Sequence, residues 1–393
     1  MRAKGVIMDI HEVPFIAMGG IYETDDLEAV NRVTAAALGA AGNFFPMPEE
    51  GEFQSRFAAH EGAAFAVATN SCGTALDCCM MALGIGPGDE VITTPLTFVC
   101  TAGCAVGRGG RAVFADIDPV TLNLDPEQVR RKITPHTRAI IPVHFSGLAC
   151  DIAAFNRISA ETGIPVIYDA AHAVSARYQG QPVGGRGLAA CYSFQSNKNM
   201  TLLGEGGAIT TNDPVFAEKV RQLKTFGYVY GGPSLRVASI GYNYRMNKAQ
   251  YAVGLTQLAK VDRVIQARQA TMLALNQLLQ GIDEIILPAG HGPEHASHLY
   301  VIRLDTDRVK FSVAQFVAYL KSHCGVGTAK HYPAVWTWEA FQALGYTGEG
   351  CPIAAKACDQ VISLPVFPHT TPEDQQAIAW GIRQSITDLS HAQ

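Results

Sequence analysis

The sequence has few charged residues and no long run of one sign. Charged residues make up 17% of 393 positions, and the formal net charge is −5. Lysine and arginine are scattered, so neither nucleic acid nor a membrane surface is expected as a main partner. No apolar run approaches the length of a membrane span, and no internal repeat or low-complexity tract is present. An anionic substrate would therefore have to be bound by local groups.

The cysteines give no sign of a metal site or a disulfide framework. The chain has ten cysteines, but no CxxC pair has zinc-ligand spacing, so no metal is expected. The start, Met1–Gly5, is not followed by the long apolar stretch of a signal peptide. Six cysteines lie in apolar or helical patterns, where a free thiol packs as a small hydrophobe: Cys72, Cys78, Cys79, Cys100, Cys104 and Cys191. We therefore expect a reduced, cytoplasmic, soluble protein.

Short apolar runs alternate with helix-like segments from Ala63 to Thr210. Strands are predicted at 63–68, 90–93, 112–115, 139–143 and 165–168, and a helix at 74–83. Strands that alternate with helices predict βαβ units and a mostly parallel sheet covered on both faces. The fold class predicted for this part is therefore α/β.

The pattern changes in the last third of the chain. A long helix is predicted over 248–279, with apolar residues at helical spacing. A strand at 299–304 follows, and then helices at 313–320 and 371–389. A chain of this length suits two domains, and a long helix often bridges them. We predict a large domain at 1–260 and a smaller α+β domain at 261–393.

The most informative feature is an acid and a lysine, each placed after a predicted strand. Asp169 ends the apolar run 164–168, and Lys198 follows the apolar stretch 188–192. Functional groups in an open α/β sheet collect beyond the carboxyl ends of its strands. Pyridoxal phosphate needs a lysine that forms a Schiff base with its aldehyde and a carboxylate that pairs with its pyridinium nitrogen. Taken singly, Asp169 could be a helix N-cap and Lys198 a surface lysine.

A larger set of segments resembles the DegT/DnrJ/EryC1/StrS family of sugar aminotransferases. The resemblance runs from about Glu52 to the C-terminus. It implies pyridoxal 5′-phosphate as cofactor and a large domain built on a mostly parallel, seven-stranded-type sheet. Besides the segments of Asp169 and Lys198, the motifs that carry it are Asn70–Leu76, Pro87–Ile92, Thr97–Val99, Val143–Gly147, Gly241–Met246 and Leu364–Pro368.

The resemblance also implies further cofactor-binding residues. His172 would contact the ring oxygen of the cofactor, and Phe98 would stack on the ring. The phosphate would be bound at the turn that contains Gly73 and Thr74, because a helix N-terminus favours an anion, and Ser193 would add a hydroxyl. For each of these residues a purely structural role is the alternative.

The same resemblance implies an active site shared between two subunits. Asn243 would reach the phosphate of the neighbouring subunit, so a homodimer is expected. Arg245 lies in the same segment, and for it a structural role is as plausible as a functional one. An ordinary loop before the long helix is the alternative for Asn243.

The sequence departs from the family pattern at two places. The family has a Glu before the Gln of the long helix, where this chain has Asn247–Gln250. After His331–Pro333 the family commonly has a further Pro and a His, where this chain has Ala334–Trp338. Both places are near the substrate in the family, so they put the identity of the amino acceptor in doubt.

We therefore expect a pyridoxal-phosphate-dependent aminotransferase. An amino group would move from glutamate or glutamine to a keto-sugar, nucleotide-linked or phosphorylated, or to a cyclitol. Lys198 and Asp169 would be its catalytic residues. One alternative is a sugar dehydratase on the same scaffold, although a relative with that activity carries His at the position of Lys198. The other is a non-catalytic regulator, which predicts damage at Lys198 or Asp169.

Overall fold

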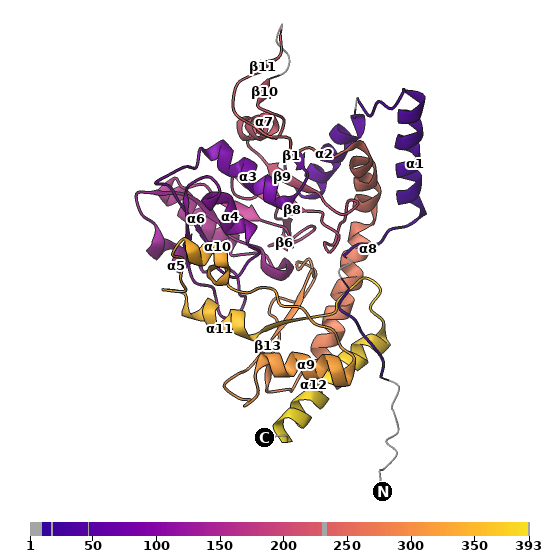
Figure 1. The fold of residues 1–393 in the computed structure, drawn as a ribbon, viewed down its shortest axis with the longest axis vertical. Helices are drawn as coiled ribbons and strands as arrows, with labels where there is room; N and C mark the ends of the chain where they lie inside the picture. Colours follow the sequence, from indigo (N-terminus) through magenta and orange to yellow (C-terminus); the bar gives the residue numbers. More distant parts are fainter. Residues whose placement is uncertain (1–9, 17–18, 46, 230–233, 392–393) are drawn as a thin grey trace.

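The structure is a computed structural model that describes residues 10–16, 19–45, 47–229 and 234–391 (Figure 1). Met1–Gly5, on which the expectation of no signal peptide depends, lies outside these ranges. None of the described helices is both long and apolar enough to cross a membrane. The helices before residue 230 are α1 (Thr24–Gly39), α2 (Pro48–His60), α3 (Cys72–Leu83), α4 (Cys100–Val106), α5 (Pro126–Lys132), α6 (Ile152–Thr162) and α7 (Pro214–Leu223), with a 3₁₀ turn at Phe145–Gly147.

The central sheet consists of a four-stranded and a three-stranded part. Two parallel bridges, between Ile140 and Val166 and between Val143 and Asp169, join them into one surface of seven strands within the described residues. The order is β1-β9-β8-β5-β4-β2-β3, and β9 is antiparallel to both of its neighbours. The predicted mostly parallel sheet is confirmed. Its strands are β1 (Phe65–Thr69), β2 (Glu90–Thr93), β3 (Arg111–Phe114), β4 (Thr137–Ile141), β5 (Ile167–Asp169), β8 (Ala189–Ser193) and β9 (Gly207–Thr211).

Both faces of this sheet are buried. Successive strand residues alternate between two apolar clusters, so Ile140 and Val166 belong to one cluster and Ile141 and Ile167 to the other. Side chains along a strand point to opposite faces. Burial on both sides explains why these strands have continuous apolar runs rather than a polar–apolar alternation.

Helix α8 (Lys248–Leu279) has the bounds predicted from the sequence. Asn247 caps it and exchanges hydrogen bonds with Gln250 in a capping box. The predicted domain boundary at residue 260 falls within this continuous helix and stays a prediction. Figure 1 shows α8 running from the central sheet toward α9 and α12.

The C-terminal part is α+β, as predicted. Three antiparallel strands pack with helices around an apolar cluster of their own. The strands are β12 (Ile285–Ile286), β13 (Tyr300–Leu304) and β14 (Val361–Leu364), and the helices of this cluster are α9 (Val313–Cys324) and α12 (Pro372–His391). Helices α10 (Glu339–Ala343) and α11 (Pro352–Gln360), with a 3₁₀ turn at Val335–Thr337, pack in another apolar cluster that also includes Ala102 and Phe114. Short hairpins elsewhere are β6 (Arg177–Tyr178) with β7 (Gln181–Pro182), and β10 (Tyr228–Val229) with β11 (Arg236–Val237).

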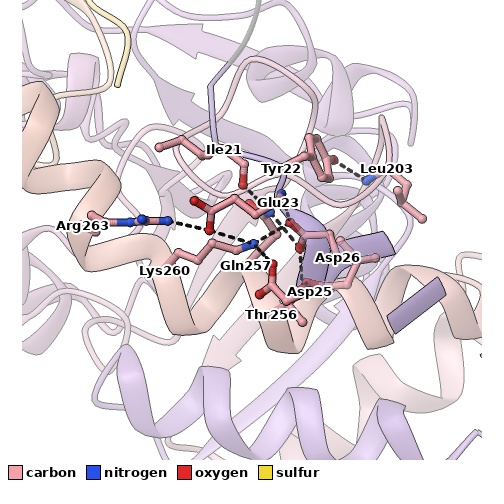
Figure 2. A network of polar contacts seen from close by, with 11 residues as sticks. Ile21, Tyr22, Glu23, Asp25, Asp26, Leu203, Thr256, Gln257, Lys260 and Arg263 are labelled. Atoms are coloured by element: carbon pink, nitrogen blue, oxygen red, sulfur yellow. Dashed lines mark hydrogen bonds and ion pairs between the residues drawn. The ribbon is translucent and has the colours of Figure 1, made fainter. Parts of the chain in front are cut away.

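A polar network fixes the start of α1 on α8 (Figure 2). The ammonium of Lys260 contacts Asp25 at 2.6 Å and Asp26 at 2.5 Å. Just before α1, the hydroxyl of Tyr22 accepts a 2.8 Å hydrogen bond from the backbone N–H of Leu203, in the loop between β8 and β9. The start of α1 is therefore bound to α8, and Tyr22 binds the preceding segment to the loop that carries Lys198.

Candidate active site

Asp169 and Lys198 line one cavity of about 410 Å³. Asp169 is the last residue of β5, and Lys198 lies in the loop after β8. These two strands are parallel neighbours in the sheet, so both carboxyl ends meet at the same edge. The structure therefore brings the acid and the lysine to one place, and their roles stay predictions.

Most of the other predicted cofactor-binding residues line the same cavity. Gly73, Phe98, His172 and Ser193 do so. Thr74 and Asn243 are not among the lining residues. The roles proposed for all of these residues remain predictions, but the structure brings six of the eight predicted site residues to one place: Gly73, Phe98, Asp169, His172, Ser193 and Lys198.

The carboxylate of Asp169 is buried and held by hydrogen bonds. Its side chain accepts from the hydroxyl of Thr101 at 2.7 Å and from the backbone N–H of Ala171 at 3.0 Å. Burial raises the pKa of Asp169, whereas the two hydrogen bonds and the charge of Lys198 act in the opposite direction. The carboxylate is thus fixed in orientation at the floor of the cavity.

Lys198 is largely enclosed by the protein. Removal from solvent lowers the pKa of its ammonium, while Cys72 and Asp169 act to raise it. Its Nζ lies 3.5 Å from Nε2 of His298. A lowered pKa increases the fraction of free amine at neutral pH, and a free amine can form covalent bonds and accept protons.

The N-terminus of α3 forms one wall of the cavity. Ser71 is the N-cap residue and accepts a hydrogen bond from the backbone N–H of Thr74. The hydroxyl of Thr74 donates to Asn70 at 2.7 Å, so this side chain serves the cap. Gly73 lines the cavity and leaves the first turn of the helix open to a bound anion.

His172 shares its surroundings with residues that sequence reasoning did not find. Its Nε2 lies 2.9 Å from the hydroxyl of Tyr332, and its ring centre is 4.5 Å from that of His298. Burial lowers the pKa of both histidines well below the usual value, so both are neutral. Tyr332 and His298 come from chain segments more than 100 residues away. Tyr332 lies in the segment His331–Pro333, which the family resemblance places near the substrate without giving Tyr332 a role, whereas the local sequence of His298 carries no catalytic pattern.

These residues fit pyridoxal phosphate. The buried carboxylate of Asp169 suits a protonated ring nitrogen, and Lys198 suits an aldehyde. The Nδ1 of His172 is buried and, among the described groups, has no hydrogen-bond partner, so it can bind a polar atom of a ligand. The N-terminus of α3 and Ser193 suit a phosphate.

Asn243 does not line the cavity of its own subunit. The side chain of Asn243 is exposed and accepts a 2.9 Å hydrogen bond from Nε of Arg245. The guanidinium of Arg245 also lies over the ring of Phe226. Within one subunit these contacts are structural, and the reach of Asn243 into a neighbouring subunit stays a prediction.

The segment Ala334–Trp338, one of the two departures from the family pattern, packs mainly against other parts of the same chain. Trp336 contacts the ring of Phe114 at 5.9 Å between ring centres, whereas Trp338 is about half exposed. Neither tryptophan lines the cavity of Lys198. At the other departure, the amide of Gln250 donates to the carbonyl of Glu205 at 2.6 Å, so it holds the loop between β8 and β9.

Comparison with known proteins agrees with this geometry. Residues 24–383 match the model of the DegT/DnrJ/EryC1/StrS aminotransferase family. The chain is 37% identical to the spore coat polysaccharide biosynthesis protein SpsC of Bacillus subtilis (strain 168), over 86% of this chain and 90% of SpsC.

Two solved structures have the same fold. DesV of S. venezuelae superposes with a TM-score of 0.84 and 30% identity, over 95% of this chain and 98% of DesV. NtdA of Bacillus subtilis, solved with bound cofactor PMP, gives a TM-score of 0.86 and 26% identity, over 97% of this chain and 86% of NtdA. The α/β aminotransferase fold predicted from the sequence is therefore confirmed.

Proposed function

Because this chain belongs to the DegT/DnrJ/EryC1/StrS aminotransferase family, we propose that it moves an amino group from glutamate or glutamine to a keto-sugar or a cyclitol. It is a pyridoxal-phosphate-dependent sugar aminotransferase. The observation that carries the proposal is the meeting of Lys198 and Asp169 in one cavity.

Lys198 is proposed as the base and acid of the reaction. When bound, pyridoxal phosphate supplies an aldehyde for attachment of an amine and an electron-withdrawing ring. The Nζ of Lys198 would take the proton from the substrate carbon that bears the amino group and would hold it for return. Its lowered pKa increases the fraction of free amine that can do this work.

Asp169 and the first turn of α3 are proposed to hold the cofactor. Hydrogen bonds from Thr101 and Ala171 hold the carboxylate of Asp169 in place. In this position the carboxylate would keep the ring nitrogen of the cofactor protonated. The phosphate binds at Gly73 and Ser193, where backbone N–H groups of the helix and a hydroxyl are available.

The rest of the cavity suits a polar, uncharged acceptor. Gln195, Asn197 and Glu205 line it, and amide and carboxylate groups can bind sugar hydroxyls. Apart from Lys198, the described lining includes neither lysine nor arginine. We propose that these three side chains contact the hydroxyl-bearing ring of the acceptor, and that any phosphate or nucleotide on it extends beyond the cavity.

We also propose a homodimer with shared active sites. Large apolar side chains are exposed beside Asn243, at Phe226 (38%), Val237 (61%), Ile240 (81%) and Tyr242 (44%). A second copy of the chain would cover them and bring Asn243 to the partner's phosphate site. The ten cysteines carry free thiols, and we place the protein in a reducing compartment, the cytoplasm.

Transfer of ¹⁵N tests the proposed reaction. The protein would be incubated with keto-sugar acceptors and with glutamate or with glutamine, each labelled at the amino group. We expect label in an amino-sugar product and parallel-line initial-rate kinetics. Product that lacks a hydroxyl group and contains no ¹⁵N would indicate the dehydratase instead. No product with any acceptor or donor, from protein that binds the cofactor, would contradict the proposal.

A further inference from the structure

Gly19 packs directly against the main chain of the lysine segment. Its N–H donates a 2.9 Å hydrogen bond to the carbonyl of Ser196. A Cβ atom at position 19 would lie 1.8 Å from the carbonyl oxygen of Lys198, so this approach requires glycine. The backbone of Lys198 is therefore in contact with the segment that precedes α1.

His298 contacts Lys198 from the other end, at its ammonium group. The amide nitrogen of Asn199 donates to the carbonyl of Ala296 at 2.6 Å, so the amide oxygen of Asn199 faces His298. That oxygen lies 3.3 Å from Nδ1 of His298. Nδ1 therefore carries the proton, and Nε2, 3.5 Å from Nζ of Lys198, is free to accept from the ammonium.

One buried side chain, Arg268 of α8, connects these two contacts. Its guanidinium donates to the carbonyl of Gly19 at 2.8 Å and to the carbonyl of His298 at 3.1 Å. A third hydrogen bond, of 2.7 Å, reaches the carbonyl of Val366. A single planar group thus holds both the segment behind Lys198 and the residue at its amine.

The surroundings of Arg268 are unusual for a purely structural residue. It is 1% exposed, and no carboxylate pairs with it among the described residues. Burial lowers its pKa to about 9, so it is still a cation at neutral pH. A buried cation with only carbonyl partners contributes little stability compared with an apolar side chain. A role in the geometry of the site explains why an arginine stands here.

We propose that Arg268 is a positioning residue for Lys198, which it holds between the main chain of Gly19 and the imidazole of His298. The inference rests on the proposed function, in which Lys198 is the reacting amine. Without the guanidinium, Gly19 and His298 lose their common anchor. The amine of Lys198 then gains solvent, and its pKa rises toward the ordinary value of about 10.4.

Titration of Lys198 in the full-length protein freed of cofactor tests this role. Pulse labelling with acetic anhydride at a series of pH values, followed by peptide mass spectrometry, gives the pH of half-maximal labelling. The comparison of Arg268→Lys with wild type leaves in place the titratable groups that face Lys198: Cys72, Cys100, Asp169, His172, Glu205, His298 and His331.

We expect the labelling midpoint of Lys198 in Arg268→Lys to move up by about one unit, a roughly tenfold loss of free amine at neutral pH. The matched control is Arg383→Lys, because Arg383 also donates to a carbonyl, that of Leu278 at 2.7 Å, but is exposed. This control should titrate as wild type. A folded Arg268→Lys protein with an unchanged midpoint would overturn the proposal.

A second variant covers the case in which Arg268→Lys does not fold. Gly19→Ala retains Arg268 and every charged group, but its Cβ displaces the carbonyl of Lys198. The same upward shift of the Lys198 labelling midpoint is expected, and an unchanged midpoint counts against the positioning role of Arg268. A different result would contradict the proposed function, namely full aminotransferase activity of Lys198→Ala. If Lys198→Ala is inactive and neither Arg268→Lys nor Gly19→Ala shifts the midpoint, only the positioning role of Arg268 is contradicted.

Discussion

The hydroxyl of Thr101 donates a 2.7 Å hydrogen bond to the carboxylate of Asp169, at the floor of the cavity. This bond opposes the effect of burial, which raises the pKa of the carboxyl group. A hydrogen bond to a charged group is worth about 1.5–3 kcal/mol. Thr101 therefore helps to keep Asp169 ionised.

Thr101→Val should move the acidic limb of the pH–rate profile to higher pH. Loss of the hydrogen bond raises the pKa of Asp169 further, so the carboxylate becomes protonated at a higher pH. The measurement is kcat as a function of pH. Thr93→Val is the control, since the buried hydroxyl of Thr93 donates to the carbonyl of Ile141 at 2.7 Å and does not contact Asp169. An acidic limb that stays in place would argue against an ionised Asp169 in the reaction.

Asp169→Asn should remove most of the activity while the fold persists. The amide is similar in shape but cannot balance a protonated ring nitrogen, and we expect kcat to fall by roughly 100-fold or more. Asp213→Asn is the matched control. Asp213 caps α7 with 2.8 and 3.0 Å hydrogen bonds, and asparagine caps equally well. If both variants keep wild-type kcat, Asp169 is only a structural residue.

Gly73→Ala should separate stability from cofactor affinity. A Cβ at this position would meet Cys100 and Ser71 at 3.7 Å, which is ordinary van der Waals contact. Alanine favours the helix by about 1 kcal/mol, so the melting temperature should stay or rise. The added methyl group narrows the phosphate site, so the Kd for pyridoxal phosphate should rise about tenfold, or about 1.4 kcal/mol. Unchanged affinity by fluorescence titration would exclude Gly73 from the phosphate site.

Lys260→Met should destabilise the contact between α1 and α8. It leaves the buried carboxylate of Asp26 without its cation, at a cost of roughly 1–3 kcal/mol. Lys356→Met is the control, because Lys356 and Asp307 form an exposed ion pair and should change stability by at most about 1 kcal/mol. Chemical denaturation monitored by circular dichroism measures both. Equal, small effects would show that the network in Figure 2 adds little to stability.

The same network should lose strength in acid. Burial acts to raise the pKa of Asp26, but hydrogen bonds from Lys260 and Thr256 outweigh it and lower the pKa in the folded protein. A group with a lowered folded pKa stabilises the fold above its unfolded pKa, and this contribution disappears as the pH falls through the folded value. Between about pH 5 and pH 3, wild type should therefore lose more stability than Lys260→Met. A parallel decline of the two proteins would contradict this assignment.

The sequence predicts the parts of the site that follow strand ends. Asp169 and Lys198 could be found because an apolar run marks each preceding strand, and the bounds of α8 followed from the helical spacing of its apolar residues. The antiparallel direction of β9 could not be predicted, since an apolar run reads the same in either direction. Gly19, Arg268 and His298 were not found, because their contacts with one another and with Lys198 join residues about 30 to 250 positions apart along the chain.

The absorption spectrum of purified protein with pyridoxal phosphate tests the central claim most directly. Wild type should show a yellow band from cofactor attached to Lys198, and glutamate or glutamine, added without acceptor, should bleach it. Lys198→Arg, which keeps the charge but cannot attach the aldehyde, should lack the band, and exposed Lys219→Ala should behave as wild type. The account is contradicted if Lys198→Arg gives the same band and the same bleaching as wild type.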